Sequence, residues 1–448
     1  MTIDRSLVLF NYDWDATAYA ALKDRYPHDS AGFDLFSFPS NVHLAWFDMA
    51  RFTERMARRA VRRGYRAVVS NHEQFGALAA ALLAERMSWP GTPVKAVLAC
   101  QHKLYARQVL ERVCPESNLA FAPLEARYGD PIPDGLTYPL FIKPVKAAFS
   151  VLARSVANRE ELQAHTRFGA WELWVIRHLV EPFERIARKR IPEAPSAHRM
   201  MIEEPMHGRQ YNLDGYVREG ALHEIGFVDS IMYPGTQSFM RFDYPSRLPP
   251  LARIQALDVA RRFLAEVGFN HGMFNMEFFY DAATGRLTVI EFNPRLASQF
   301  SDLYRRVDGI DLHEMTLALA HGRDPAGLPR AVASAGAAAS FVYRSFDQRL
   351  APAMPGRAAR ARLQEQFPDA LLFTYPKQED QAARDFKWLG SHRYGIMHLG
   401  GRGPEDLHRR CERASALLGW TPPYAEYHNQ LGGAIPAPGN LVAIADET

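Results

Sequence analysis

The stretch of sequence that decides the fold is MFNMEFFYDAATGRLTVIEFNPRLASQ, residues 273–299. Its centre, residues 281–285 (DAATG), is a polar turn between two runs rich in β-forming residues, which predicts a β-hairpin. Side chains alternate between the two faces of a strand, so Glu291 and Asn293 share one face of the second strand. With Glu277 on the first strand, the hairpin carries two carboxylates and an amide at defined positions.

The pairing of the two strands decides whether these carboxylates meet. We pair Tyr280 with Arg286 across the turn. This register places Glu277 opposite Val289, and therefore diagonal to Glu291, which shares the face of Val289. Diagonal neighbours lie about 7–8 Å apart at Cα, so two carboxylates there can share a cation. The alternative is a solvated face, but both glutamates have apolar sequence neighbours, and buried carboxylates require a counter-charge. Carboxylate and amide oxygens suit a hard cation such as Mg²⁺. The expected metal ligands are Glu277, Glu291 and Asn293.

An amphipathic pattern precedes the hairpin. Residues 251–267 predict a helix that ends at Gly268, because apolar residues recur there at spacings of three and four. The expected apolar face consists of Leu251, Ile254, Leu257, Ala260, Leu264 and Val267.

The first hundred residues alternate short apolar runs with a helical pattern. Residues 6–10 (SLVLF), 66–70 (RAVVS) and 94–99 (VKAVLA) are expected strands, and residues 75–87 are an expected helix rich in Ala and Leu. Such alternation is typical of parallel α/β units. We therefore expect residues 1–100 to form a small doubly wound domain.

Other segments of the chain have simpler patterns. Residues 104–113, 160–190 and 404–418 have helical patterns, and residues 138–144 are densely apolar. Residues 322–336, rich in Pro, Ala and Gly, are the best candidate for a boundary between domains.

Composition excludes several classes of protein. The 448 residues include 53 Lys and Arg against 50 Asp and Glu, a net charge of +3, which argues against a nucleic-acid binder. The basic run at residues 184–190 is therefore interpreted as a solvated helix face. No apolar run reaches the about 18 residues of a membrane span, and the N-terminus lacks a signal-peptide pattern. The three cysteines have no paired spacing. We expect a cytoplasmic protein without nucleic-acid or membrane partners.

The metal-binding hairpin resembles that of the ATP-grasp superfamily. Residues 290–295 (IEFNPR) are similar to its E-[FIV]-N-P-R signature, and Glu277 falls where the preceding acidic ligand is expected. The resemblance implies an ATP-grasp fold of the α/β (α+β) class. It implies an N-terminal doubly wound pre-ATP-grasp domain over residues 1–100, an ATP-grasp domain over 101–321 with a lid at about 141–215, and a C-terminal accessory domain over 322–448.

Three further segments resemble the nucleotide site of this family. Residues 94–107 are similar to the entry region, where a lysine near the start of a helix reaches the phosphates, and this lysine would be Lys103. Residues 140–144 (LFIKP) resemble the strand that carries a second phosphate-binding lysine, Lys143. The alternative for either lysine is a surface residue that does not bind phosphate. Residues 201–206 (MIEEPM) resemble the hinge that holds adenine.

The resemblance implies how the hinge recognises the nucleotide. The backbone of Glu204 and Met206 would hold adenine, while the Glu203 side chain would accept from its exocyclic amine. Alternatively, this acidic pair is a solvated strand end. Gln210 stands where a ribose-binding glutamate is usual, and its amide still bonds hydroxyl groups.

The loop after Lys143 departs from the family pattern. This loop is normally rich in Gly and Ser, so that its backbone amides can close over phosphates. Residues 145–154 (VKAAFSVLAR) contain no glycine. Here Ser150 would keep the hydroxyl contact, and Lys146 or Arg154 would supply charge.

Most enzymes of this superfamily phosphorylate a carboxylate with ATP, and an amine then attacks the acylphosphate. The resemblance therefore implies ATP and Mg²⁺ as cofactors, with two metal ions or Mn²⁺ as variants, and small carboxylate and amine substrates. A homodimer is the default assembly. The alternatives are a phosphotransferase and a nucleotide-binding module without turnover.

Two arginines are candidates for holding the substrate carboxylate. Arg295 follows the metal ligands by two residues and should point into the same cleft. Its alternative is a structural ion pair with an acid such as Asp302 or Asp308. Arg241 lies in a polar and aromatic stretch, residues 233–244, that is interpreted as a loop, where an arginine more often faces solvent.

Overall fold

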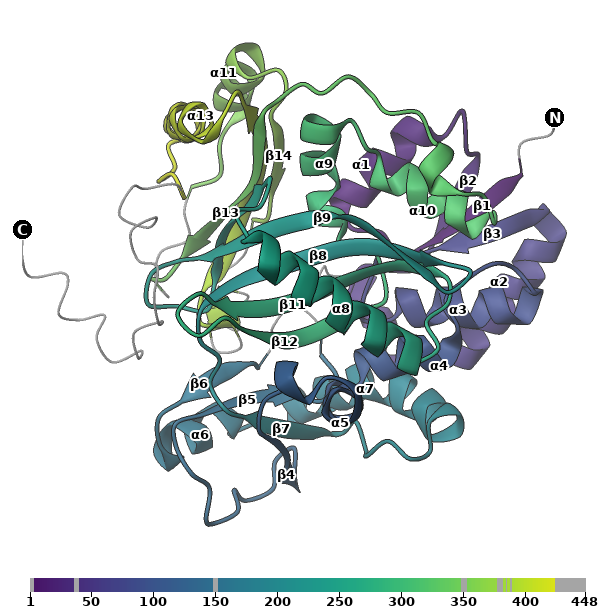
Figure 1. Cartoon of the computed structure of the whole chain (residues 1–448), viewed down its shortest axis with the longest axis vertical. Coiled ribbons are helices and arrows are strands. Elements are labelled where there is room, and N and C mark those ends of the chain that lie inside the picture. The colour runs from purple at the N-terminus through teal and green to yellow at the C-terminus, as the bar shows by residue number, and fades with distance from the viewer. Residues whose placement is uncertain are drawn as a thin grey trace, which may run out of the picture.

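The computed structural model describes residues 4–35, 40–147, 152–347, 353–376, 382–383, 385–386 and 389–423. Within these residues the chain forms a three-stranded, a four-stranded and an eight-stranded sheet, with helices packed against them (Figure 1). Ser150 and the residues after 423 lie outside the described residues, so the expectations for them stay predictions. No helix in the described part of the chain has the length and apolar character needed to cross a bilayer.

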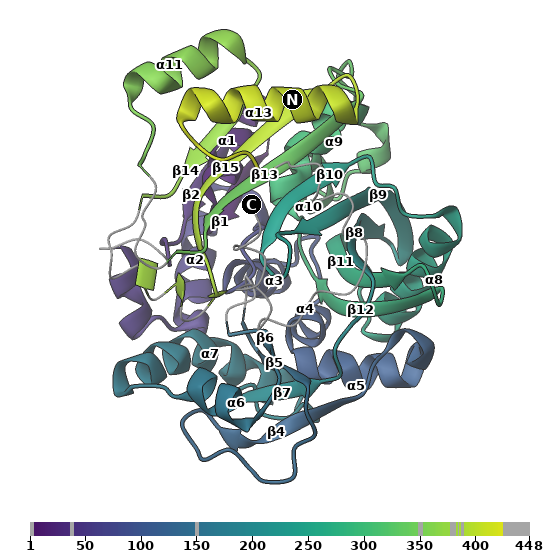
Figure 2. The same cartoon turned by 90° about the vertical axis from the view of Figure 1, so that its left-hand side faces the viewer.

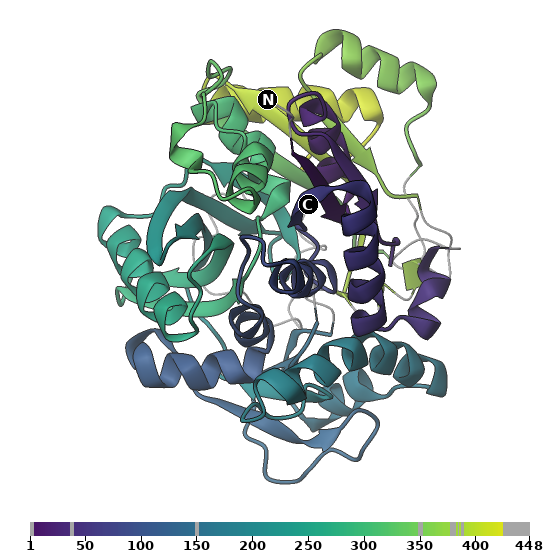
Figure 3. The ribbon, with the colours of Figure 1, turned by 90° about the vertical axis from the view of Figure 1, so that its right-hand side faces the viewer.

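The N-terminal sheet is parallel, in the order β2-β1-β3, as the alternating pattern predicts. Figure 3 views the molecule from the side on which these purple N-terminal elements lie. Residues 6–10 and 66–70 match two of its strands, and residues 75–87 match a helix. The elements are β1 (Arg5–Leu9), α1 (Asp13–Leu22), β2 (His28–Ala31), η1 (Ser40–Trp46), α2 (Met49–Arg63), β3 (Tyr65–Val69) and α3 (Gly76–Met87).

The expected strand at residues 94–99 is wrong, because this segment is helix α4 (Val94–Gln101). Pro93 precedes its first turn, where a missing N–H costs nothing. All its residues except Lys95 are buried, so the helix lacks a polar face. A short apolar run of this kind does not distinguish a buried helix from a buried strand.

The four-stranded sheet has the order β4-β7-β5-β6. The helical pattern at residues 160–190 forms two helices rather than one, because the chain is not helical at residues 167–169. The basic end of the second helix faces solvent: Arg185 and Arg188 are 60% and 66% exposed at the side chain and pair with glutamates one turn earlier. The elements are β4 (Phe121–Arg127), β5 (Leu140–Pro144), β6 (Arg154–Val156), α6 (Arg159–Thr166), α7 (Ala170–Arg190) and β7 (Arg199–Glu203).

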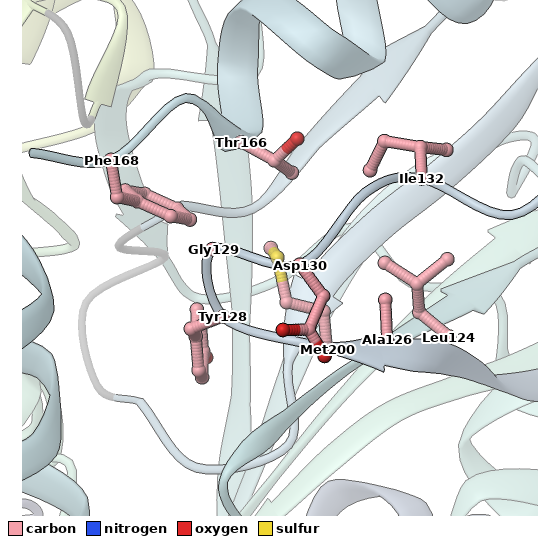
Figure 4. Close-up of a pocket in the computed structure, with 9 residues that line it drawn as sticks. All are labelled: Leu124, Ala126, Tyr128, Gly129, Asp130, Ile132, Thr166, Phe168 and Met200. Atoms are coloured by element: carbon pink, nitrogen blue, oxygen red, sulfur yellow. The ribbon is translucent and has the colours of Figure 1, made fainter.

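A small cavity lies between β4, β7 and the end of α6 (Figure 4). Its volume is about 10 Å³, which is room for about one water molecule. Leu124, Ala126, Ile132 and Met200 line it with apolar side chains. It is therefore a packing gap rather than a ligand site.

The large sheet is antiparallel, in the order β12-β11-β8-β9-β10-β13-β15-β14 (Figure 2). β13 pairs with β10, so the chain beyond residues 322–336 extends this sheet rather than forming a separate one. The strands are β8 (Arg209–Arg218), β9 (Ala221–Met232), β10 (Phe239–Tyr244), β11 (Gly272–Asp281), β12 (Arg286–Asn293), β13 (Ala337–Ser345), β14 (Leu371–Thr374) and β15 (His392–Gly401).

The amphipathic helix before the hairpin is α8 (Pro250–Glu266), but its expected apolar face is partly wrong. Leu251 and Ile254 are 63% and 65% exposed. The helix instead packs through small residues and through Phe263, whose ring stacks on Phe292 at 4.0 Å between centroids. Apolar residues cover a broad arc of this helix, so their spacing alone did not select the buried face.

The remaining helices pack around the large sheet. The expected helix at residues 404–418 is confirmed and is capped by Gly419. These elements are α5 (Lys103–Val113), η2 (Pro115–Ser117), η3 (Ser298–Phe300), α9 (Ser301–Asp308), α10 (Leu312–Ala320), η4 (Pro325–Gly327), α11 (Arg357–Gln366) and α13 (Pro404–Leu418).

Candidate active site

The hairpin exists, but its register differs from the expected one. Asp281, not Tyr280, pairs with Arg286. Further along, Phe278 pairs with Val289 and Glu277 pairs with Glu291, so Ile290 is an extra residue in a β-bulge. The bulge turns Glu291 away from the face of Val289 and places it directly opposite Glu277 rather than diagonal to it.

Arg107 of α5 holds this bulge from outside the hairpin. Its guanidinium donates to the carbonyl oxygen of Val289 at 2.7 Å and to that of Ile290 at 3.4 Å. The same group forms an ion pair with Glu203 at 2.7 Å and is 1% exposed. Arg107 was missed from the sequence, because one arginine in an amphipathic helix carries no signal that it is buried. It links the hinge strand to the strand that carries Glu291.

The two opposed glutamates have different partners. Glu291 forms an ion pair with the Lys103 ammonium at 2.9 Å. Glu277 accepts from the amide nitrogens of Gln210 at 2.9 Å and Asn293 at 3.2 Å. Lys103 is thus ion-paired with Glu291, whereas Glu277 is held by two neutral amides.

The pKa values of this pair reflect that arrangement. Burial, followed by the facing charge of Glu291, raises the pKa of Glu277. Burial also acts to raise the pKa of Glu291, but Lys103 and Lys143 outweigh it and hold that pKa below its usual range. A cation between the carboxylates would relieve the repulsion that separates these pKa values.

The donor set fits Mg²⁺. Glu277, Glu291 and Asn293 lie at the same end of paired strands, because Asn275 pairs with Asn293 next to the two glutamates. No cluster of three or more His, Cys, Asp or Glu side chains able to hold a metal occurs in the described ranges. Two carboxylates and an amide oxygen leave coordination positions for phosphate oxygens, which is how Mg²⁺ is commonly bound.

Both expected phosphate-binding lysines lie close to these glutamates. Lys103 is the first residue of α5, and its ammonium also donates to the carbonyl oxygen of Ala147 at 2.8 Å. Lys143 on β5 is 3% exposed and pairs with Glu203 at 2.8 Å. Burial lowers the pKa of Lys143 to about 8, although Glu203 acts in the opposite direction. Neither lysine is a surface residue.

The hinge glutamate Glu203 is buried and only partly satisfied. Its Oε1 atom accepts from Arg107 and Lys143, while Oε2 has no hydrogen-bond partner among the described residues. Burial acts to raise the pKa of this carboxyl, but the two cations hold it below its usual range. A buried acceptor atom without a donor fits an exocyclic amine, so the chemistry of this position suits adenine.

The other residues expected at the nucleoside differ in their exposure and in their hydrogen-bond partners. Glu204 is exposed, and its N–H already donates to the carbonyl oxygen of Ala120 at 3.0 Å. Its own carbonyl oxygen is therefore the backbone group best able to meet a nucleotide. Met206 is half-buried. Gln210, expected at the ribose, instead donates to Glu277.

Arg295 lies in the site and is bound by a residue of the loop that follows β3 of the N-terminal sheet. Its guanidinium pairs with Glu73 at 2.6 Å, with side chains 14% and 7% exposed. Arg295 thus forms an ion pair with an acid, as its alternative reading expected, but the acid is Glu73: Asp302 pairs with Arg306, and Asp308 accepts from Tyr244. Glu73 follows β3 and was missed because it lies 222 residues away in sequence.

The structure does not bring Arg241 to this site. Arg241 lies on β10 rather than in a loop, is 0% exposed, and forms an ion pair with Asp243 at 3.0 Å. Its neighbour Phe242 pairs with Ser230, which pairs with Gln210. Phe242 therefore shares the face of the sheet that carries Glu277, and Arg241 points to the opposite face. The strand was read as a loop because its polar residues conceal the β pattern.

Comparison with known proteins identifies part of the chain. A sequence profile described as "ATP-grasp domain" matches residues 136–302. These residues are an ATP-grasp domain. The ATP-grasp domain includes Lys143, Glu203, Glu277 and Glu291, whereas Lys103 and Glu73 precede it.

One relative is similar in sequence to part of the chain. The carbamoyl phosphate synthase large chain of Thermotoga neapolitana is 30% identical over 156 residues, which are 32% of this chain. The matched part is 13% of that longer relative.

Solved structures show the fold of the rest of the chain. The L-amino acid ligase from Bacillus licheniformis superposes with a TM-score of 0.67 at 14% identity, covering 92% of this chain and 97% of that chain. The biotin carboxylase domain dimer of Hydrogenobacter thermophilus 2-oxoglutarate carboxylase, in complex with MgADP, ADP and bicarbonate, gives a TM-score of 0.57 at 14% identity, covering 93% and 90%. Together these matches show an ATP-grasp fold over most of the chain.

Proposed function

We propose that this protein is an ATP-dependent carboxylate–amine ligase that forms an amide through an acylphosphate and releases ADP and phosphate. The observation that carries the proposal is the directly opposed, largely buried pair Glu277 and Glu291, with Lys103 on one of them. Such a pair suits a metal-bound triphosphate better than a structural role, because opposed carboxylates repel one another.

The roles proposed for these residues follow from the charges of their side chains. Glu277, Glu291 and Asn293 would hold Mg²⁺, which supplies charge neutralisation for the phosphates. Lys103 and Lys143 would bind phosphate oxygens once the nucleotide competes for their ammonium groups. The ligands assigned to the nucleoside are Glu203, Glu204, Met206 and Gln210, with Ser150 assigned to the phosphates.

Arg295 would hold the acceptor carboxylate, because its guanidinium already binds a carboxylate, that of Glu73. A carboxylate oxygen attacks the γ-phosphorus, and the bond between that phosphorus and the ADP oxygen breaks. The amine nitrogen then attacks the carbonyl carbon, and phosphate leaves with the electrons of the broken C–O bond. The nitrogen loses its extra proton to water, so acid, amine and ATP yield amide, ADP and phosphate.

The structural neighbours support this class of reaction. One is named as an L-amino acid ligase, and another was solved in complex with MgADP, ADP and bicarbonate. The second is described as a dimer. We propose a homodimer here too, which light scattering would detect as twice the 50.7 kDa of one chain.

The test of the function is release of ADP and phosphate from Mg-ATP across a matrix of carboxylic acids and amines. Glu291→Gln serves as the blank. Release that requires both an acid and an amine, and that disappears in the variant, is the expected result. Release with one acceptor alone would indicate a phosphotransferase instead. Binding of Mg-ATP without release for any pair would favour a binding module.

Nucleotide affinity is expected to fall as the pH rises above about 8. Burial lowers the pKa of Lys143 to about 8, so its ammonium loses a proton, and a positive charge, above that pH. One lost charge weakens phosphate binding by at most about tenfold per pH unit. Calorimetric titration with ADP across this range would measure the effect, and Lys143→Arg, which stays charged, should flatten it. A wild-type affinity independent of pH would show that Lys143 does not bind phosphate.

A further inference from the structure

Lys146 is a buried cation that forms no ion pair with a carboxylate of the described residues. It follows β5 by two residues and is 2% exposed. Its ammonium lies 3.4 Å from the carbonyl oxygen of Glu73 and 5.1 Å from the ring centroid of Phe183. Within the described part of the chain, no carboxylate lies within 4.0 Å of it. A carbonyl dipole and an aromatic face only partly replace the water that burial removes.

The other cations of the site are all paired. Lys103 meets Glu291, Lys143 meets Glu203, and Arg295 meets Glu73. A buried ammonium without a counter-charge is costly, and natural proteins keep one where a ligand supplies the anion. Burial also lowers the pKa of Lys146 to about 7; the charge of Glu73 acts against this shift, and that of Lys103 acts with it. A bound anion would raise this pKa.

The backbone places Lys146 between the two halves of the site. Val145 accepts from the backbone N–H of Lys103, and Ala147 accepts from the Lys103 ammonium at 2.8 Å. Both sequence neighbours of Lys146 therefore accept hydrogen bonds from Lys103, the lysine that faces Glu291. On its other side it contacts Glu73, whose carboxylate binds Arg295. The anion that reaches Lys146 thus lies between the proposed phosphate side and the proposed acceptor side.

We propose that Lys146 is a further catalytic residue that binds the phosphoryl group in transit between ATP and the carboxylate held by Arg295. This inference rests on the proposed function. It also accounts for the loop that follows, because residues 145–154 contain no glycine to bring backbone amides onto the phosphates. A fixed ammonium at the start of the loop supplies part of the charge that such amides would otherwise supply.

Nucleotide binding tests the assignment without requiring turnover. Lys146→Met keeps the length of the side chain and removes its charge. We expect it to weaken binding of Mg²⁺ with the ATP analogue AMP-PNP by about tenfold or more, and binding of Mg-ADP by less than about threefold. Lys146→Arg should restore most of the AMP-PNP affinity. Lys95 is the exposed residue of α4, so Lys95→Met is the matched control and should change neither affinity.

Thermal unfolding separates a functional lysine from a structural one. Removing an unpaired buried charge should raise the melting temperature of the nucleotide-free protein, whereas removing a structural lysine should lower it. A lower melting temperature in Lys146→Met, or equal effects on ADP and AMP-PNP, would overturn the proposal. If the wild type binds AMP-PNP but releases no ADP that depends on an acid and an amine, the ligase function alone is contradicted. The binding and unfolding measurements still test the role of Lys146 in that case.

Discussion

Glu277→Gln and Glu291→Gln are each expected to lower kcat for ADP release by about 10³-fold, because each removes one of two charged metal ligands. Their effects on stability should have opposite signs. In the metal-free protein the two carboxylates repel one another, so Glu277→Gln should raise the melting temperature. Glu291→Gln instead removes the partner of the Lys103 ammonium and should lower it.

The measurements are ADP release under saturating Mg-ATP and thermal unfolding without nucleotide. Glu224→Gln is a suitable control, because Glu224 is an exposed glutamate on β9 of the same sheet. It should change neither quantity. Retained turnover in either variant would contradict the assigned metal site. A loss of stability in Glu277→Gln would show that this carboxylate is structural, whatever its effect on turnover.

Arg107→Met is expected to lower the free energy of unfolding by about 3–5 kcal/mol, because it breaks a buried ion pair from one side. Glu203 would then keep only Lys143 as a partner. The carbonyl oxygens of Val289 and Ile290 would also lose their donor, so the bulge that turns Glu291 toward Glu277 would lose its support. We expect Arg107→Met to bind nucleotide more weakly as well as to unfold more easily.

Urea unfolding measures this effect. Arg112→Met, an exposed position on the same helix, is the matched control and should change stability by less than about 0.5 kcal/mol. In the double variant Arg107→Met/Glu203→Met the two losses should be less than additive, because both single changes break the same ion pair. If the loss of stability in the double variant equals the sum of the losses in Arg107→Met and Glu203→Met, the two side chains are not energetically coupled.

Much of the site could be read from the chain because it is local. The turn at residues 281–285 and the alternation along its two strands predicted the hairpin, and residues 290–295 matched a known signature. The profile match to residues 136–302 and the structural neighbours confirm the ATP-grasp fold. The roles of the individual site residues stay predictions.

Errors arose where the answer depended on distant partners. The segment 94–99 is a helix because it is buried on all sides, which its composition alone does not reveal. Arg241 lies on a strand because β9 and β13 pair with β10 on either side. In each case the local pattern was compatible with two structures, and tertiary contacts selected one.

The sequence by itself determined which residue types stand at the metal-binding hairpin and that the hairpin forms, because turn chemistry and strand alternation act over a few residues. Only the tertiary structure decided that Glu277 and Glu291 face one another, since the bulge between them is held by Arg107 of a separate helix. It also decided which charges are paired. Glu73 reaches Arg295 across 222 residues, and no carboxylate in the described ranges reaches Lys146, because chain packing places charges independently of their separation in sequence.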